Sequence, residues 1–290
     1  MINAHFFWHG PALSLYETAC LTSFVQQGIA VNLHTFNHAL KVPQGVTLRD
    51  AAVLARPEEV LAYTQGGHAQ SIAAFTDIFR YRVLSRAPGW WFDTDVFCLA
   101  PAQRYAELQT LSKGLLLGLE EAGKVNGAVL YVSDPALAQD LERRAEAIGK
   151  VFEWGAIGPG LVTKFMQAFP DRVTALDRQY FYPIHYLEVE RFFRPEDCTG
   201  SLAACEGAVC VHLWNEFLRR WRIPKNLLPC EGSYLAGLFA GVGVSVAPSA
   251  ALPNDTFEAL RHNGEIGRVG HKALRVVRGL KKVKAAVTGR

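Results

Sequence analysis

Two aspartates, Asp93 and Asp95, stand one residue apart directly after the apolar, aromatic run Gly89-Trp90-Trp91-Phe92. Residues i and i+2 of an extended segment point to the same side and lie roughly 6–7 Å apart. Two carboxylates that face one place repel each other unless a cation lies between them. A divalent metal ion that carries a phosphate-containing ligand meets this need. The simpler alternative is an acidic turn that closes a strand.

A second pair of charged residues, Asp77 and Arg80, lies on a predicted helix over residues 68–86, just before this stretch. Apolar residues at helical spacing indicate that the helix packs against a sheet. Such a helix would bring Asp77 and Arg80 toward the end of the strand that carries the two aspartates. Taken alone, the pair is better explained as a solvated i, i+3 ion pair that contributes about 0.2–0.5 kcal/mol.

The chain opens with elements that could position these groups. A strand that ends at Gly10-Pro11 is followed by a helix from Ser14 to Gln27 and a strand over residues 29–35. Ser14 is the expected N-cap, with Glu17 three residues on as the partner of a capping box. The order strand–helix–strand favours a parallel pair within an α/β sheet.

The rest of the chain continues the α/β pattern. Residues 36–67 contain several Pro and Gly positions and are predicted as loops and short helices over the sheet edge. Further strands are expected at 115–119, 127–132, 171–176, 181–184 and 208–214, and further helices at 135–148 and 161–169. No internal repeat or low-complexity linker interrupts the sequence, so one α/β domain over residues 1–260 is the simplest interpretation.

Residues 261–290 differ in composition, with nine Lys or Arg and one acidic residue. The segment 274–284 could form a basic amphipathic helix on an anionic membrane surface. A solvated basic tail explains the same composition equally well.

The bulk composition limits the class of protein. A chain of 290 residues that is 50% hydrophobic can build a sizeable core. The formal net charge of +3 argues against a nucleic-acid-binding surface over most of the molecule. The six cysteines form no CxxC pair and no recognisable zinc pattern, which indicates reduced thiols and an intracellular protein. We see no signal peptide and no apolar run of the ~18–20 residues that span a bilayer.

Several reaction classes use carboxylates in this pattern. A metal held by Asp93 and Asp95 could neutralise the diphosphate of a nucleotide sugar during glycosyl transfer. A phosphatase or phosphotransferase could use Asp93 as the nucleophile, although the expected downstream metal-binding acids are absent from the sequence. Glycoside hydrolysis fits poorly, because its two carboxylates flank the bond from opposite sides. The non-enzymatic alternative is a nucleotide-sugar-binding protein that keeps the metal site without turnover.

The chain contains, in this order, Phe7-Trp8-His9-Gly10, the helical segment 75–81 and the block 89–96. These three segments and their order resemble the DxD-motif glycosyltransferases of glycosyltransferase family 32, which include α-1,4-galactosyltransferases and α-1,6-mannosyltransferases. The resemblance implies a GT-A-like, Rossmann-like nucleotide-sugar-binding domain with a mixed, mainly parallel sheet. It also implies metal-dependent transfer of a hexose to a glycan or glycolipid, with retention of configuration and with a UDP-sugar favoured over a GDP-sugar as donor.

The resemblance also assigns roles to individual residues. Trp8 would lie against the nucleotide base, whereas Asp77 and Arg80 would hold the ribose or the donor sugar and its phosphate. Asp93 would contact the ribose and sugar, and Asn126 is expected on the acceptor side. No catalytic nucleophile is identified.

The metal implied by the resemblance is Mn²⁺ or Mg²⁺. Asp95 would be its main ligand, with Asp93 as a second ligand and His212 as the third. For His212, which ends a predicted strand, a structural histidine is the alternative. The expected location is the cytoplasmic face of the inner membrane, where the enzyme would build a surface polysaccharide and contact anionic lipid through its basic tail.

Overall fold

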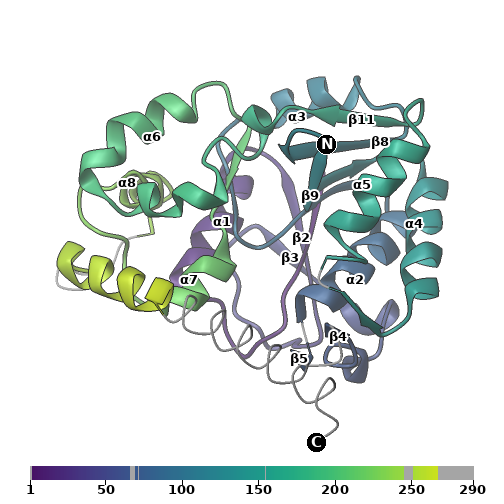
Figure 1. Cartoon of the computed structure of the whole chain (residues 1–290), viewed down its shortest axis with the longest axis horizontal. Helices are drawn as coiled ribbons and strands as arrows, with labels where there is room; N and C mark the ends of the chain where they lie inside the picture. Colours follow the sequence, from purple (N-terminus) through teal and green to yellow (C-terminus); the bar gives the residue numbers. More distant parts are fainter. Residues whose placement is uncertain (1, 66–68, 71, 154, 245–250, 267–290) are drawn as a thin grey trace, which may run out of the picture.

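The computed structural model describes residues 2–65, 69–70, 72–153, 155–244 and 251–266 (Figure 1). At its centre is a seven-stranded sheet with the order β11-β8-β9-β6-β1-β2-β3. Its strands are β1 (Asn3–Phe7), β2 (Ala30–Thr35), β3 (Val46–Asp50), β6 (Gly89–Phe92), β8 (Leu115–Glu121), β9 (Lys124–Val132) and β11 (Val173–Leu176). Only β9 runs antiparallel to its neighbours in this sheet. The prediction of a mixed, mainly parallel α/β sheet is confirmed.

The strand order reverses at β1. Helix α1 (Leu15–Gln26) leads from β1 to β2 on one side, whereas β6, which follows α2 (Ile72–Arg86), pairs with β1 on the other side. In open α/β sheets, the crevice outside the carboxyl ends of the strands at such a switch point is the usual ligand site. Trp8 and Asp93 directly follow β1 and β6 at this place.

Helices cover both faces of the sheet. Helices α2, α4 (Pro135–Ile148) and α5 (Pro159–Ala168) lie together on one face, and α1 and α3 (Ala102–Gln109) lie on the other (Figure 1). Successive side chains of β6 alternate between the two cores: Trp90 and Phe92 pack on the α1 side and Trp91 on the α2 side. A strand buried on both faces is apolar at every position, which explains the uninterrupted aromatic run.

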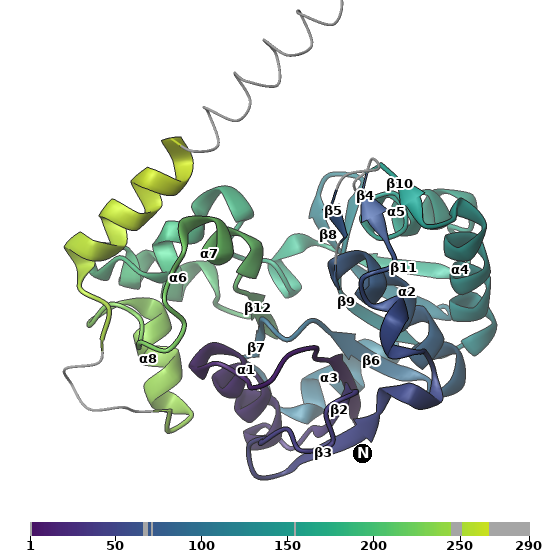
Figure 2. The ribbon, with the colours of Figure 1, turned by 90° about the horizontal axis from the view of Figure 1, so that it is seen from below.

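The second half of the chain adds a mainly helical layer beside α1 (Figure 2). This layer contains η3 (Arg178–Tyr180), η4 (Tyr186–Phe192), η5 (Pro195–Asp197), α6 (Cys198–Ala204), β12 (Cys210–His212), α7 (Asn215–Trp221), α8 (Tyr234–Gly241) and a helix over 254–266. Its apolar residues join the core that contains α1, as Phe239 against Tyr16 shows. Strand β12 pairs antiparallel with β7 (Val96–Cys98), the strand that follows the two aspartates. This strand pairing places the helical layer next to the two aspartates.

The small elements complete the α2 side. They are η1 (Ala51–Val53), η2 (Pro57–Glu59) and a small sheet formed by β4 (Thr64–Gln65), β5 (Ala69–Gln70) and β10 (Val151–Phe152). All six cysteines are free, as expected. Among the described residues, no helix combines the length and the apolar character that crossing a membrane requires.

Three predictions about elements were wrong. Residues 46–50 form the edge strand β3, which the sequence conceals because its side chains are mostly exposed and polar. Residues 181–184 form no strand, because Phe181 and Tyr182 turn back through hydrogen bonds to the Arg178 carbonyl. Residues 93–95, expected to be extended, form a turn between β6 and β7, which lie in different sheets.

The basic tail is only partly described. Residues 261–266 continue the helix that begins at 254, and residues 267–290, with the expected amphipathic segment 274–284, lie outside the described residues. The division of the chain at residue 260 stays a prediction.

Candidate metal centre

The segment Asp93-Thr94-Asp95 is a turn between β6 and β7. The sequence predicts an extended segment here. The Val96 N–H donates to the Asp93 carbonyl at 3.0 Å, which closes the turn. One ligand atom each from Asp93, Asp95 and His212 lie within 4.8 Å of one another. The three residues that gather here are the three predicted metal ligands.

Residues of the helical layer contact the Asp95 carboxylate. Its Oδ2 lies 3.1 Å from His212 Nε2 and accepts a hydrogen bond from the Asn215 backbone N–H at 2.8 Å. Burial alone would raise the pKa of Asp95, but His212, the Asn215 N–H and Lys225 outweigh burial and lower it to about 2. The same contact raises the pKa of His212, although burial opposes the shift. Asp95 is thus a carboxylate that stays ionised.

The turn after β12 depends on an unusual backbone conformation. Trp214 has φ 56° and ψ 53°, the left-handed region that bulky residues rarely adopt. Its indole N–H donates to the Ile184 carbonyl at 2.9 Å, and its ring packs 4.3 Å from that of His212. This conformation starts α7 immediately after His212 and directs the Asn215 N–H at Asp95. Nothing in the residue types of this segment indicates a left-handed turn.

A residue of helix α2, Arg80, contacts the Asp93 carboxylate. Arg80 donates from Nη2 to Asp93 Oδ1 at 3.0 Å, and its Nη1 lies 3.1 Å from Asp77 Oδ1. The Trp91 indole N–H also donates to Asp93 Oδ1, at 2.9 Å. Because only 4% of the Arg80 side chain is exposed, the solvated ion pair that the sequence favoured is wrong. The expected approach of Asp77 and Arg80 to the strand end is what the structure shows.

Two glycines leave the space for this cluster. A Cβ at Gly127 would lie 2.1 Å from Arg80 Nη1, and a Cβ at Gly158 would lie 2.3 Å from Asp77 Oδ2. Gly158 is the N-cap of α5, so the absence of a side chain at the start of this helix leaves room for the Asp77 carboxylate. Burial raises the pKa of Asp77 to about 6, with Arg80 opposing the shift and Asp93 adding to it.

The remaining predicted residues lie at the edges of the site. Trp8 follows β1 and is half-buried, and its indole Nε1 has no hydrogen-bond partner among the residues that the structure describes. Asn126 lies within β9, where its amide donates to Glu120 Oε2 at 2.7 Å and its oxygen accepts the Ala128 N–H at 2.8 Å. Both polar atoms of Asn126 are therefore used inside the β8–β9 hairpin. The ligand-binding roles of Trp8 and Asn126 stay predictions.

The donor set suits a divalent cation. Two carboxylates and one imidazole are ligands that Mn²⁺ accepts readily, and the carboxylates also suit Mg²⁺. Nδ1 of His212 is buried and without a partner in the described part of the chain, so this ring is not saturated by protein contacts. The residues present thus fit the implied metal.

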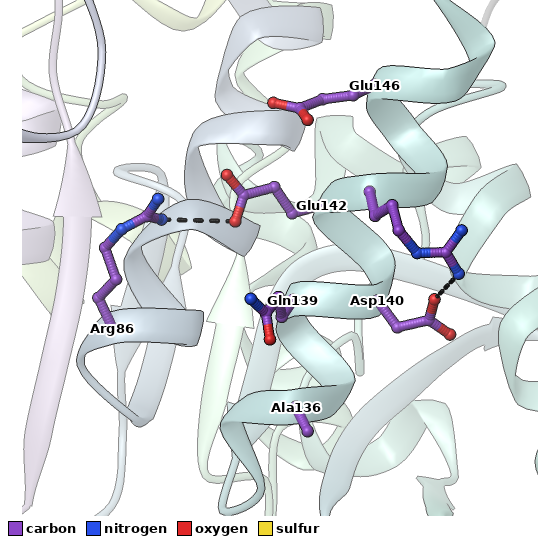
Figure 3. Close-up of a pocket in the computed structure, with 7 residues that line it drawn as sticks. Arg86, Ala136, Gln139, Asp140, Glu142 and Glu146 are labelled. Carbon is purple, nitrogen blue, oxygen red and sulfur yellow. Dashed lines mark hydrogen bonds and ion pairs between the residues drawn. The ribbon is translucent and has the colours of Figure 1, made fainter.

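A separate pocket lies over α4, away from these residues (Figure 3). Its lining includes Arg86, which reaches Glu142 at 3.4 Å, and Asp140, which pairs with Arg143. None of the predicted site residues lines it. Its charged groups pair with one another, which is typical of a solvated helix face.

Comparison with known families supports the predicted class. The family model described as "Alpha 1,4-glycosyltransferase conserved region" matches residues 150–228, which include β12, Trp214 and α7. The match confirms the resemblance to this group of glycosyltransferases and the enzyme class, a glycosyltransferase. No curated protein matches the chain in sequence.

Solved glycosyltransferase structures resemble the chain at low sequence identity. The apo form of mouse xyloside xylosyltransferase 1 is 12% identical, with 73% of this chain and 96% of that chain covered and a TM-score of 0.41. The bifunctional glycosyltransferase WbbM is 11% identical, with 85% and 50% covered and a TM-score of 0.48. Apo GlyE of Streptococcus pneumoniae TIGR4 is 11% identical, with 92% and 64% covered and a TM-score of 0.47. The chain thus spans half of the length of WbbM and just under two thirds of that of GlyE.

Proposed function

We propose that this glycosyltransferase moves a hexose from a nucleotide-sugar donor to a glycan or glycolipid acceptor, with a divalent cation and with retention of configuration. A UDP-sugar is favoured over a GDP-sugar. The observation that carries the proposal is the meeting of Asp93, Asp95 and His212 within 4.8 Å, beside the switch point of a mainly parallel sheet.

Asp95, Asp93 and His212 would hold Mn²⁺ or Mg²⁺. When bound, the cation would neutralise the departing nucleoside diphosphate as a Lewis acid. Asp95 supplies the ionised carboxylate, because His212 and the Asn215 N–H stabilise its charged form. Arg80 and Trp91 bind Oδ1 of Asp93, which fixes the orientation of that carboxylate before any ligand arrives.

The residues around the cation would orient the donor. Asp77 and Arg80 lie on the α2 side of Asp93 and would contact the ribose or the transferred sugar and its phosphate. Trp8 lies past the end of β1 and would stack on the base through its indole face. Asn126 would act on the acceptor side by holding Glu120 in place.

Two alternatives use the same residues differently. A phosphotransferase would need Asp93 as a free nucleophile, but Oδ1 of Asp93 accepts from both Arg80 and Trp91. A non-catalytic nucleotide-sugar-binding protein would keep the whole cluster without turnover. The family match over residues 150–228 favours the transferase over both.

A thermal-shift screen of UDP- and GDP-sugars, each with and without Mn²⁺, tests the proposal. A donor that binds only the folded protein, at ~100 times its Kd, should add about 2.7 kcal/mol of stability. Release of the nucleoside diphosphate with an added glycan acceptor then separates a transferase from a binding protein. Stabilisation by phosphomonoesters alone would favour the phosphotransferase.

The proposed setting is the cytoplasmic face of the inner membrane, in the synthesis of a surface polysaccharide. The excess of Lys and Arg in residues 261–290 supports a peripheral contact with anionic lipid. Removal of residues 267–290 should then reduce binding to anionic vesicles. Equal binding by the full and the truncated chain would contradict the contact.

A further inference from the structure

We propose that Glu17, on helix α1, is a positioning residue for the metal centre and acts through Asn215 and Lys225. The inference rests on the proposed function, because it concerns how tightly the cation is held. Glu17 has no solvent exposure, although it lies in the first turn of α1, where a capping glutamate is ordinarily at the surface.

The Glu17 carboxylate joins two helix starts. Its Oε2 accepts from the Ser14 backbone N–H at 3.0 Å and from the Ser14 hydroxyl, which forms the capping box of α1. Its Oε1 accepts from the Asn215 side-chain amide at 3.2 Å and from the Lys225 ammonium. Lys225 in turn donates to Asn215 Oδ1 at 3.1 Å. Glu17, Asn215 and Lys225 therefore form a closed triangle of polar contacts.

The triangle ends at the metal centre. Asn215, whose side chain is fixed at both polar atoms, is the residue whose backbone N–H donates to Asp95 Oδ2 at 2.8 Å. The Leu15 N–H also donates to the Lys225 carbonyl at 3.2 Å, which ties the start of α1 to the same segment. One residue thus separates the buried glutamate from the principal metal ligand.

The charges explain why a carboxylate is needed at this position. Lys225 acts electrostatically on Asp95, and an ammonium group near a metal ligand opposes the binding of a second cation. Glu17 pairs with that ammonium and holds it at Asn215. Without the negative charge of Glu17, the positive charge of Lys225 would act on Asp95 uncompensated, and the contact that anchors the Asn215 amide would be weaker.

Calorimetric titration of the full chain with Mn²⁺, without donor, tests this arrangement. Glu17→Gln should raise the Kd for Mn²⁺ about tenfold. Glu17→Gln combined with Lys225→Met should recover part of the affinity, because it removes the uncompensated positive charge, although it also removes one anchor of Asn215. Glu216→Gln, which removes an exposed carboxylate of α7 that pairs with Arg219 and Arg220, is the matched control and should leave the Kd unchanged. A purely structural role predicts the reverse order, because the double variant loses more buried contacts.

The outcomes are distinct. A folded Glu17→Gln variant with the wild-type Kd would overturn the inference, and so would a double variant that binds no better than Glu17→Gln. If Glu17→Gln does not fold, Asn215→Ala replaces it: this variant keeps the backbone N–H but not the anchors, and an unchanged Kd would overturn the inference. A wild-type chain that binds no Mn²⁺ would contradict the proposed function itself.

Discussion

The two aspartates of the metal centre are held by different kinds of structure. Asp93 is held by Arg80, 13 residues away, and by Trp91, in the strand that directly precedes it. Asp95 is held by the backbone N–H of Asn215, 120 residues away, and by His212, which lies three residues before Asn215. The Asp93 half of the site is thus a local helix–strand unit. The Asp95 half depends on the packing of the helical layer against β7. A sequence pattern can reveal the first half far more readily than the second.

The charges of the two halves differ as well. Beside Asp93, burial raises the pKa of Asp77 to about 6 in spite of Arg80. Beside Asp95, the cationic and N–H partners outweigh burial and lower the pKa of Asp95 to about 2. We therefore propose that the Asp95 half anchors a cation and that the Asp93 half makes polar contacts with a sugar. The variants Asp95→Asn, Asp77→Asn and Gly158→Ala test this division of roles.

The largest effect is expected for Asp95→Asn. The amide has the size of the carboxylate but no charge, so we expect loss of turnover and of metal-dependent donor binding while the fold is kept. Asp77→Asn is the matched variant from the other half and should weaken donor binding without changing the affinity for Mn²⁺. Calorimetry with Mn²⁺ and with donor separates the two. Full activity of Asp95→Asn, or of the wild-type chain in excess chelator, would contradict the metal centre.

Gly158→Ala should disturb only the Asp93 half. Its Cβ would lie 2.3 Å from Asp77 Oδ2, so the carboxylate must move, at a cost of about 1–3 kcal/mol. We expect weaker donor binding with an unchanged Kd for Mn²⁺. Gly237→Ala is the control, because a Cβ there meets nothing within 4 Å. A Gly158→Ala variant that binds donor like the wild type would show that Asp77 does not depend on this gap.

The sequence reveals the two halves unequally. The aromatic strand, the Asp-x-x-Arg helix and the pair of aspartates lie within residues 72–95, where periodicity and spacing predict their positions. His212 was predicted by resemblance alone. Its companions, the left-handed Trp214 and the Asn215 N–H, follow from a backbone conformation and a contact across the fold that no local pattern encodes. For the same reason Glu17 was identified only as a capping residue.

The geometry of the aspartate pair shows a second limit. An extended segment was expected, and the structure has a turn closed by the Val96 N–H. The run stays apolar on both sides of the turn because β6 and β7 are each buried, although in different sheets. Burial makes the two strands look like one, so the break between them cannot be located from hydrophobicity.

Trp8→Ala should weaken nucleotide binding and leave both halves of the metal centre intact. Stacking of an aromatic ring on a base contributes about 1–3 kcal/mol, so the affinity for nucleoside diphosphate should fall roughly fivefold to a hundredfold. The affinity for Mn²⁺ without nucleotide should not change. If calorimetry shows an unchanged affinity for the nucleoside diphosphate, Trp8 lies outside the nucleotide site.

Three buried histidines differ in their partners and therefore in their response to pH. Asp95 raises the pKa of His212 in spite of burial. His5 and His34 instead face each other at 3.1 Å, and burial, with Arg49 adding to it, lowers their pKa values to about 4 and about 3. A histidine with a lowered pKa contributes stability above its unfolded value of about 6.5, and this contribution is lost as pH falls toward its folded value.

Urea unfolding between pH 6.5 and 4 should therefore show stability that falls by at most about 1.4 kcal/mol per pH unit for each of the two histidines. His34→Asn should flatten this dependence, whereas His9→Asn, at an exposed position, should not. The contribution of His212 has the opposite sign, since it is full below pH 6.5 and is lost only as pH rises through its folded pKa. If the free energy of unfolding depends on pH equally in the wild type and in His34→Asn, the pair of His5 and His34 is not the acid-sensitive element. The contrast between this pair and His212 would then not hold.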